Sequence, residues 1–379
     1  MSENVIKRDN WIANFNLIGE AKINDYTFKI DERSEKSGWI YNSLNLGVDC
    51  GEKHGVVYCE MMGGFSDSGN NVIYAHGKND DGKDDFNEKL QIDWEDRMND
   101  DILESVGDLS FITVGLERTD KGKMFRKKFL SPYDAIAYIQ EYLKDGMKVN
   151  VRGTLKYSTY NDKTQVRKNI TSIFLSNADS PDKYVARFNQ SILLDSDSAS
   201  LKPENIDKDK SVMYVDARVL DYVKEINGHE IKGQYPFRKQ FEYQMDFTKP
   251  DVCKKVMDKV FKVRKGITQY TFEGIFIEGG AMITATLDDI PDEIKELIEI
   301  GVYTEEEALA RCSTNGSREQ RMILTRPYIR NTEDGSVLQR FDEKYTEEDL
   351  SFDFLYQDDS DNEDFADSDD DNMDWLNDL

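Results

Sequence analysis

Lysine and arginine alternate with aromatic residues in two neighbouring segments of the chain. In the first segment, Phe125 and Phe129 lie among four cations, Lys123, Arg126, Lys127 and Lys128. The second segment is longer, and its candidate residues are Lys148, Arg152, Lys156, Tyr160, Lys163, Arg167 and Lys168. Binding of single-stranded nucleic acid needs cations along the phosphate path and aromatic rings on which bases stack. The pattern therefore predicts a nucleic-acid surface.

Further candidates lie outside these two segments. Trp39 and Tyr41 stand on the more polar face of an alternating segment, so we expect their rings to be exposed. In the second half of the chain, Arg238 and Arg264 accompany a stripe of aromatic residues at period two. Such a stripe forms either a barrel interior or a stacking platform, and both interpretations stay open for three of its members, Phe241, Tyr243 and Phe247.

Residues typical of catalysis or metal binding are sparse. Cys50, His54 and Cys59 lie close together, but they bracket an expected hairpin turn and lack the paired CxxC spacing of zinc sites. The carboxylates between residues 93 and 101 lie in a segment that is acidic throughout, so a solvated loop is favoured over a Mg²⁺ site. No phosphate-binding loop or GxSxG motif is present. We therefore expect no enzymatic activity, no cofactor and no bound metal.

The charge of the chain is distributed unevenly. The formal net charge is −26, but residues 341–379 hold seventeen acids and one base, which leaves −10 for the rest. Thirteen bases against six acids give residues 111–175 a local +7, and ten against five give residues 228–270 a local +5. A row of lysines is usually only a solvated face. Lys148, Arg152 and Lys156 are predicted to be functional because they align on one strand face inside the first of these basic segments.

Several elements can be predicted around these residues. Strands at 147–157 and 165–175 are expected to form a long hairpin, and 39–48 and 55–62 a shorter one. Ser131 and Pro132 predict a helix start, Ile136 and Ile139 its buried face, and Gly146 its end. Residues 79–104 are expected to form a long surface loop with some helix. Short strands with one helix before the last pair are typical of a five-stranded barrel of the OB type.

The same order of elements recurs after residue 184, with helices expected at 250–260, 291–300 and 305–311. We therefore predict a mainly β fold with inserted helices (α+β), built from tandem OB-type barrels. The first domain spans residues 1–178, and the second, divergent one spans residues 179–335. An acidic disordered tail follows at residues 336–379.

The end of the tail combines strong charge with a few apolar residues. Residues 357–379 contain eleven acids and no lysine or arginine, a composition that keeps a segment unfolded. A purely solubilising tail would not need the apolar residues at its tip, which are Met373, Trp375, Leu376 and Leu379. Aromatic and leucine residues amid acids suit docking into a basic groove of a partner protein.

Two parts of the sequence resemble a known family. The segment KVNVRGTLKYSTYNDKTQVRKNITSIFL, preceded by WIYNSLNLGVDCG and GVVYCEMMGG, is similar to OB-fold single-stranded DNA-binding proteins. The ending DDDNMDWLNDL is similar to the acidic tails of bacterial and bacteriophage members, although bacterial members end in Pro-Phe and this chain ends in Asn-Asp-Leu. The large size and the expected second barrel resemble the bacteriophage members more closely. The resemblance covers residues 11–176 and the tail.

The resemblance implies a bacteriophage-type protein that binds single-stranded DNA during replication or recombination and recruits partner proteins through its tail. The N-terminus lacks the apolar stretch of a signal peptide, and no run is long enough to span a membrane, so the expected location is the cytoplasm of the host cell. Three alternatives stay open: a protein-interaction or DNA-mimic module acting through its acidic charge, a single-stranded RNA binder, and a metal-dependent nuclease.

Overall fold

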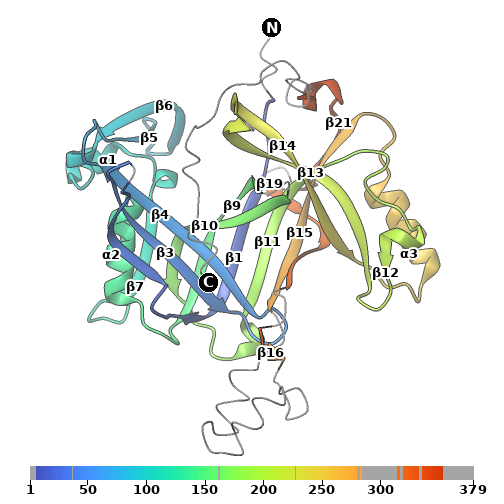
Figure 1. Ribbon diagram of the computed structural model, residues 1–379, viewed down its shortest axis with the longest axis horizontal. Helices are drawn as coiled ribbons and strands as arrows, with labels where there is room; N and C mark the ends of the chain where they lie inside the picture. The colour runs from blue at the N-terminus through green and yellow to red at the C-terminus, as the bar shows by residue number, and fades with distance from the viewer. Residues whose placement is uncertain are drawn as a thin grey trace, which may run out of the picture.

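A computed structural model describes residues 6–35, 37–160, 163–226, 228–279, 282–283, 314–315, 319–332 and 335–352. The fold is mainly β with few helices, and most strands join one large sheet (Figure 1). Within these residues, no helix is long and apolar enough to cross a membrane.

Five strands of the first half close into a barrel. They pair in the order β1–β3–β4–β10–β9–β1, and only the β4–β10 pairing is parallel. Their bounds are β1 Ala13–Lys22, β3 Trp39–Asp49, β4 Val56–Ser66, β9 Lys148–Tyr160 and β10 Lys163–Leu175. A meander of three strands followed by a pair that closes on both sides of it is the order of an OB-type barrel. The predicted closed five-stranded barrel is confirmed.

The core of this barrel follows from the alternation along its strands. Leu44, Leu46 and Val48 of β3 point inward and are buried, while the residues between them lie on the outer face. Helix α2 (Pro132–Tyr142) packs against β3 and β4, and Ser131 caps it by accepting a hydrogen bond from the Tyr133 N–H at 3.1 Å. The predicted helix start is confirmed, but the helix ends at Tyr142, before Gly146.

Several elements extend the first barrel. They are β2 Phe28–Arg33, β5 Val72–Lys78, β6 Asp84–Asp93, η1 Trp94–Asp96, α1 Asp100–Ser105, η2 Asp108–Ser110, β7 Ile112–Arg118 and β8 Met124–Phe129. Residues 79–104 were predicted to form a surface loop with some helix; α1 confirms the helix, but the loop was wrong, because β6 pairs with β5 in a hairpin within an inserted arm. Ile92 on one face of this hairpin packs with Val106, Phe111 and Leu130 in a small separate core, and this burial stabilises the arm despite its many acids.

The strands of the second half pair in a similar order. They follow β11–β13–β14–β18–β15–β11, and again only one pairing, β14–β18, is parallel. Their bounds are β11 Val185–Leu194, β13 Val212–Ile226, β14 His229–Gln244, β15 Ile267–Gly279 and β18 Glu319–Pro327. The aromatic stripe of β14 resolves as interior, since Phe237, Phe241 and Tyr243 are buried in the core.

Smaller elements complete the second half. They are η3 Pro181–Lys183, η4 Pro203–Asn205, β12 Ile206–Asp207, α3 Pro250–Val256, η5 Met257–Phe261, β16 Met282–Ile283, β17 Thr314–Asn315, β19 Ile329–Thr332, β20 Gly335–Leu338, β21 Arg340–Tyr345 and η7 Glu348–Leu350. The segment η5 is a single π-helical stretch that continues α3. The helices expected at 291–300 and 305–311 lie outside the described residues.

The predicted start of the tail, residue 336, was too early. Strand β21 pairs with β15, and the Tyr345 hydroxyl donates a hydrogen bond to the Lys7 carbonyl at 2.6 Å. Tyr345 and Leu350 are buried with Leu193 and Ile267, so apolar contacts hold residues as far as 350 against the body despite their acidic neighbours. Residues 353–379, including Met373, Trp375, Leu376 and Leu379, lie outside the described part of the chain.

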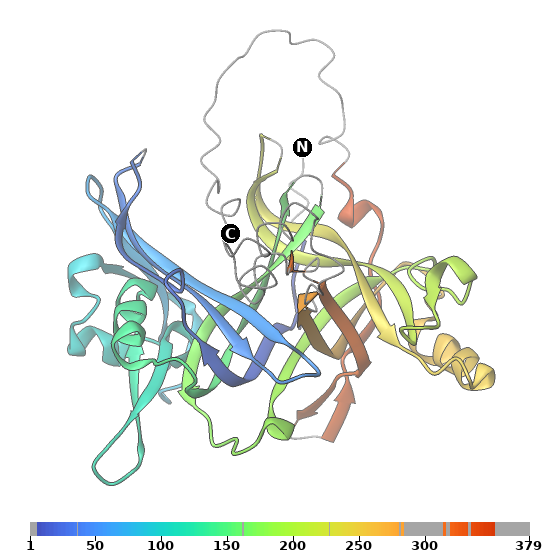
Figure 2. The ribbon, with the colours of Figure 1, turned by 60° about the horizontal axis from the view of Figure 1, so that its bottom comes forward.

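The two halves are joined along β1 and β11. These strands pair antiparallel from Ala13↔Gln190 to Ile18↔Val185, so the halves share one continuous sheet and spread from it as the two arms of a V (Figure 2). A second contact lies between the β3–β4 turn and β15. There the Lys168 ammonium and the Glu278 carboxylate form a buried ion pair, and Gly55, at φ +71°, lets the chain pass directly against the Glu278 carbonyl.

His54 makes this contact sensitive to pH. Its Nδ1 lies 2.8 Å from the Phe276 carbonyl, and burial lowers the pKa of the imidazole from its usual value of 6.5. Because the unfolded chain then binds a proton more readily than the folded chain, the stabilisation is complete above about pH 6.5 and is lost as the pH falls through the lowered pKa. Urea unfolding at pH 7.5 and 5.5 should show a larger loss of stability at the lower pH for the parent chain than for His54→Gln. An equal loss would contradict this assignment.

Candidate nucleic-acid interface

Strands β9 and β10, which form a two-stranded ribbon, contain no acidic residue; the one acid of the hairpin, Asp162, follows β9 in the sequence. The thirteen-residue strands contain six cations, three on each strand. Val149, Val151 and Leu155 point into the barrel, so the alternate residues of β9 lie on the outer face. Lys156 is opposite Arg167 on that face, and further along the ribbon Arg152 is opposite Ser172. In a chain of net charge −26, the strands of this ribbon are a local region of positive charge.

The tip of the ribbon meets the second half of the molecule. The Thr164 hydroxyl donates a hydrogen bond to the Arg238 carbonyl at 2.6 Å, which fixes the start of β10 against β14. A pocket of about 340 Å³ opens at this junction. The charged and aromatic side chains that line it are Lys163, Tyr214, Arg238, Lys239, Phe241, Glu242 and Arg321. We call it the cleft pocket.

The cleft pocket has an excess of positive charge. Arg321 donates to Glu242 at 2.9 Å, so these two charges offset each other. Lys163, Arg238 and Lys239 form no ion pair with any carboxylate in the described part of the chain. Burial, and then the nearby charge of Lys168, lower the pKa of Lys239. An anion bound in the pocket would relieve this repulsion, so the arrangement favours a phosphate group.

A second hollow lies at the other end of the ribbon, on the outer side of β1, β9 and the β7–β8 hairpin. We call it the basal groove; its volume is about 540 Å³. Its cations are Arg126, Arg152 and Lys183, and no acidic side chain lines it. The Arg126 guanidinium lies 5.5 Å from the centre of the Phe174 ring. Lys148 lies beside the groove and donates to the Asp179 carbonyl at 3.2 Å.

Three predicted site residues of the ribbon are held by carboxylates from distant parts of the chain. The Lys156 ammonium lies 3.2 Å from the buried Asp221 carboxylate, and Arg167 lies 3.8 Å from Glu60. Lys168 was expected on the surface, but it is buried beside Glu278, because its register partner is Leu155, which lies on the inner face of the barrel. Lys168 therefore forms a structural ion pair, and a nucleic-acid strand on the surface cannot contact it.

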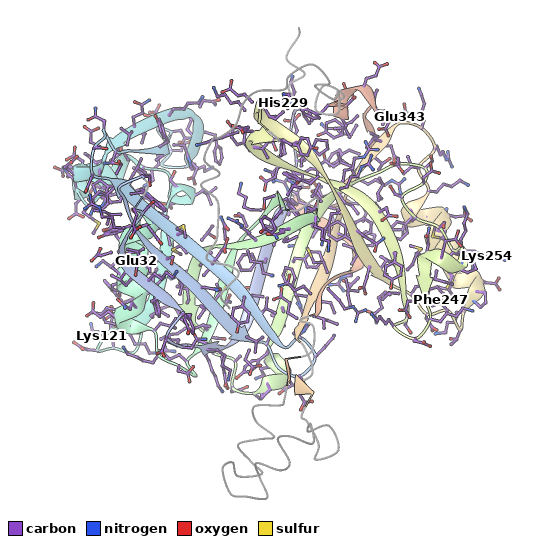
Figure 3. All side chains as sticks on the ribbon, in the orientation of Figure 1. Glu32, Lys121, His229, Phe247, Lys254 and Glu343 are labelled. Atoms are coloured by element: carbon purple, nitrogen blue, oxygen red, sulfur yellow. The ribbon has the colours of Figure 1, made fainter. Side chains whose placement is uncertain are left out.

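The cations of the β7–β8 hairpin are divided among several neighbours. Lys128 pairs with Asp108 at 2.9 Å, and Lys127 lies 4.8 Å from the centre of the Tyr138 ring. Only Arg126 of the first predicted cluster reaches the basal groove. Lys123 precedes β8 next to the hairpin turn, whose Lys121 points away from the body (Figure 3).

The remaining predicted residues are not brought together. Trp39 and Tyr41 stack on each other, with ring centres 4.8 Å apart. They lie at the start of β3, which pairs with the last residues of β4. Glu32, the register partner of Tyr41, lies on the side of the barrel away from β14 (Figure 3). Arg264 is exposed beyond η5. Tyr160, at the ribbon tip, is exposed and lies three residues from Lys163.

Sequence reasoning missed Lys239, Arg321 and Lys183. Lys239 has the same parity as the buried Phe237 and Phe241, so alternation alone does not mark it as a surface cation. Arg321 follows the segment in which helices were expected at 291–300 and 305–311, and Lys183 lies just after the expected domain boundary at residue 178. For Lys239, the neighbouring Arg238 and the local charge of +5 were the available signal.

His76, which has no partner at a recognised spacing in the sequence, lies in a polar trio. Its Nε2 is 2.7 Å from Asp84, and its Nδ1 is 2.8 Å from the Ser110 hydroxyl. This resembles a nucleophilic triad. However, the N–H groups of Leu109 and Ser110 already donate to Asp84 and to the Gly107 carbonyl, which leaves neither to stabilise an oxyanion. We interpret the trio as a set of structural hydrogen bonds that links β5 to η2.

Cys50 and Cys59 are buried in the barrel core among apolar side chains. Burial raises the pKa of both thiols. Among the described residues, no group of three or more His, Cys, Asp or Glu side chains is arranged to hold a metal ion.

The fold and the two hollows define a mainly β protein with a closed five-stranded barrel and a basic ribbon. The family model described as YorF matches residues 77–262. No curated protein matches the chain. Among solved structures, the single-stranded DNA binding protein from Thermus aquaticus aligns with a TM-score of 0.31 and 8% identity over 71% of this chain and 86% of that chain. A deletion mutant of that protein aligns with a TM-score of 0.30 and 9% identity over 71% and 87%.

Proposed function

We propose that this chain binds single-stranded DNA, largely independently of sequence and without catalysing a reaction. The observation that supports this most strongly is the β9–β10 ribbon, whose two strands contain no acid and whose tip opens into the cleft pocket beside Lys163, Arg238 and Lys239. Cations without carboxylate partners are available to phosphates, and Tyr160 and Tyr214 offer rings on which bases can stack, at about 1–3 kcal/mol each.

The second half is proposed to be another OB-type barrel. Its pairing order matches that of the first barrel, with one parallel pairing and with α3 between β14 and β15. The link between β11 and β13 consists of one register pair, Leu193↔Arg218, as does the β4–β10 link of the first barrel, Asn169↔Glu60. We propose domains at residues 1–178 and 179–352, with DNA entering between them.

A titration with fluorescent oligo-dT at low salt tests the proposed function. Binding should weaken steeply as salt rises, because each phosphate contact releases a bound counterion and contributes a slope of about −0.7 on logarithmic axes. Competition by poly-U separates a preference for DNA from one for RNA, and Mg²⁺-dependent loss of the oligonucleotide would indicate a nuclease. Undetectable binding at low salt would end the proposal and favour a module that acts through its acidic charge.

We further propose that the acidic tail competes with DNA. The described chain leaves the body beside the cleft pocket, since Phe352 lies 5.1 Å from Tyr235 in a hollow that Arg238 also lines. The eleven acids of residues 357–379 follow directly and would be attracted to the same cations. In bacteriophage replication or recombination, DNA would displace the tail, and Met373, Trp375, Leu376 and Leu379 would then bind partner proteins.

Removing residues 357–379 is therefore expected to raise the affinity for oligo-dT several-fold at low salt, with a smaller gain at high salt where the attraction is screened. Parallel titrations of the full chain and a 1–356 truncation measure this. A variant in which Asn and Gln replace the acids of 357–379 keeps the length of the tail and serves as the control. Equal affinity of the full chain and the truncation would refute competition by the tail.

A further inference from the structure

The basal groove is a second basic hollow, separate from the cleft pocket and at the other end of the ribbon. Arg126, Arg152 and Lys183 line it from three separate segments of the chain. Lys183 pairs with Asp179 at 2.7 Å, but Arg126 and Arg152 have no carboxylate partner in the described ranges. Both arginines are exposed and line the same groove, so an anion bound there would be attracted by two charges that no carboxylate offsets.

The walls of the groove match a nucleotide as well as a phosphate. Phe174 and Met124 supply an apolar surface, and Asn150, Ser176 and Asn177 supply neutral hydrogen-bonding groups. The Arg126 guanidinium is held over the Phe174 ring, an arrangement that leaves its N–H groups free at the edges. A flat base can rest on such a platform while its phosphate contacts the arginines.

The groove and the cleft pocket are the two ends of one ribbon. Strand β10 runs from Lys163 at the cleft pocket to Leu175 at the groove, a span of at most about 40 Å. Between the ends, Lys156 lies opposite Arg167 on the outer face and Arg152 lies opposite Ser172. Neither strand of the ribbon contributes an acid to this face. A polyanion that leaves the cleft pocket passes Lys156 and Arg167, which Asp221 and Glu60 hold in ion pairs, before it reaches Arg152, which has no carboxylate partner in the described ranges.

We propose that the basal groove is a second phosphate-binding site for the same DNA strand, so that a long strand follows the β9–β10 ribbon from the cleft pocket to Arg152 and Arg126. This rests on the proposed function and extends it. A short oligonucleotide fills the cleft pocket alone, and only a longer one reaches the groove. The groove thereby sets the length of DNA that the chain covers.

The experiment compares oligo-dT of about six nucleotides, near the lower end of the usual site sizes of OB folds, with oligo-dT of about twenty, which exceeds them. For Arg126→Ala/Arg152→Ala, the affinity for the long oligonucleotide should fall about tenfold and its salt slope should flatten by about 1.4, as the loss of two phosphate contacts requires. The affinity for the short oligonucleotide should stay unchanged. Arg126→Lys/Arg152→Lys keeps the charges and should keep most of the salt slope.

The matched control is Lys121→Ala/Lys254→Ala, which removes the same charge from two exposed positions, on the β7–β8 turn and on α3 (Figure 3). It should bind both lengths as the parent chain does. If the parent chain binds both lengths equally well, or if the groove variant loses both equally, the inference is overturned while DNA binding stands. If the parent chain binds neither length, the proposed function itself fails.

A final measurement distinguishes a DNA strand from a free nucleotide as the ligand of the basal groove, since both carry a phosphate and a base. Calorimetric titration with dTMP should give no binding at concentrations up to about a millimolar, because one phosphate gains little without the rest of the strand. Tight dTMP binding that is lost in Arg126→Ala/Arg152→Ala would show a separate nucleotide site and would contradict a continuous path.

Discussion

Replacing Lys163, Arg238 and Lys239 together by alanine is expected to lower the affinity for oligo-dT about a hundredfold at low salt. These cations line the cleft pocket from both halves of the chain and have no carboxylate partner in the described residues. Three lost phosphate contacts should also flatten the salt slope by about 2. Fluorescence anisotropy at several salt concentrations measures both quantities.

The control for this triple variant is Lys121→Ala/Lys254→Ala/Lys255→Ala, which makes the same change in net charge at exposed positions outside the pocket. If both triple variants lose affinity equally, the effect comes from the overall charge of the molecule, and the cleft pocket has no special role. Thermal melting of both variants shows whether the fold is retained.

The second large effect concerns stability. Glu278→Ala is expected to lower the free energy of unfolding by about 3–5 kcal/mol, because it leaves the Lys168 ammonium buried without its partner. The Glu278 carboxylate also accepts a hydrogen bond from the Tyr58 N–H at 3.3 Å, which the substitution removes. Urea unfolding, followed by tryptophan fluorescence, measures the loss.

The double variant Lys168→Met/Glu278→Leu provides the comparison, since it replaces the pair with apolar side chains of similar size. It should recover most of the stability, because no unpaired charge remains. If Glu278→Ala unfolds at the same urea concentration as the parent chain, the pair does not hold the two halves together.

Local patterns predicted the parts of the fold that depend on neighbours in sequence. Ser131 and Pro132 marked the start of α2 correctly, and the alternation of Val149, Val151 and Leu155 identified the long strand of the ribbon. The closed barrel then followed from the order of strands and helix. The acidic residues of the arm concealed β6, since its burial depends on Val106, Phe111 and Leu130 further along the chain.

The site was harder to predict, because ion pairing joins residues that are distant in sequence. Lys156 and Lys168 looked equivalent to Arg152, yet Asp221 and Glu278 hold them, each more than sixty positions away. Nothing in the local spacing distinguishes an ammonium with such a partner from a free one. The split of one predicted basic face into a cleft pocket and a basal groove likewise depends on how β14 and the β7–β8 hairpin meet the ribbon.

The most direct test of the account is to locate the bound strand. The full chain is mixed at low salt with oligo-dT in which bromodeoxyuridine replaces thymidine, irradiated, digested and analysed by mass spectrometry. We expect cross-links on the β9–β10 ribbon and on β13 or β14, with Tyr160 and Tyr214 as the principal sites. Cross-links confined to the β5–β6 arm or to α3, or the absence of any cross-link, would contradict the claim that the ribbon binds single-stranded DNA.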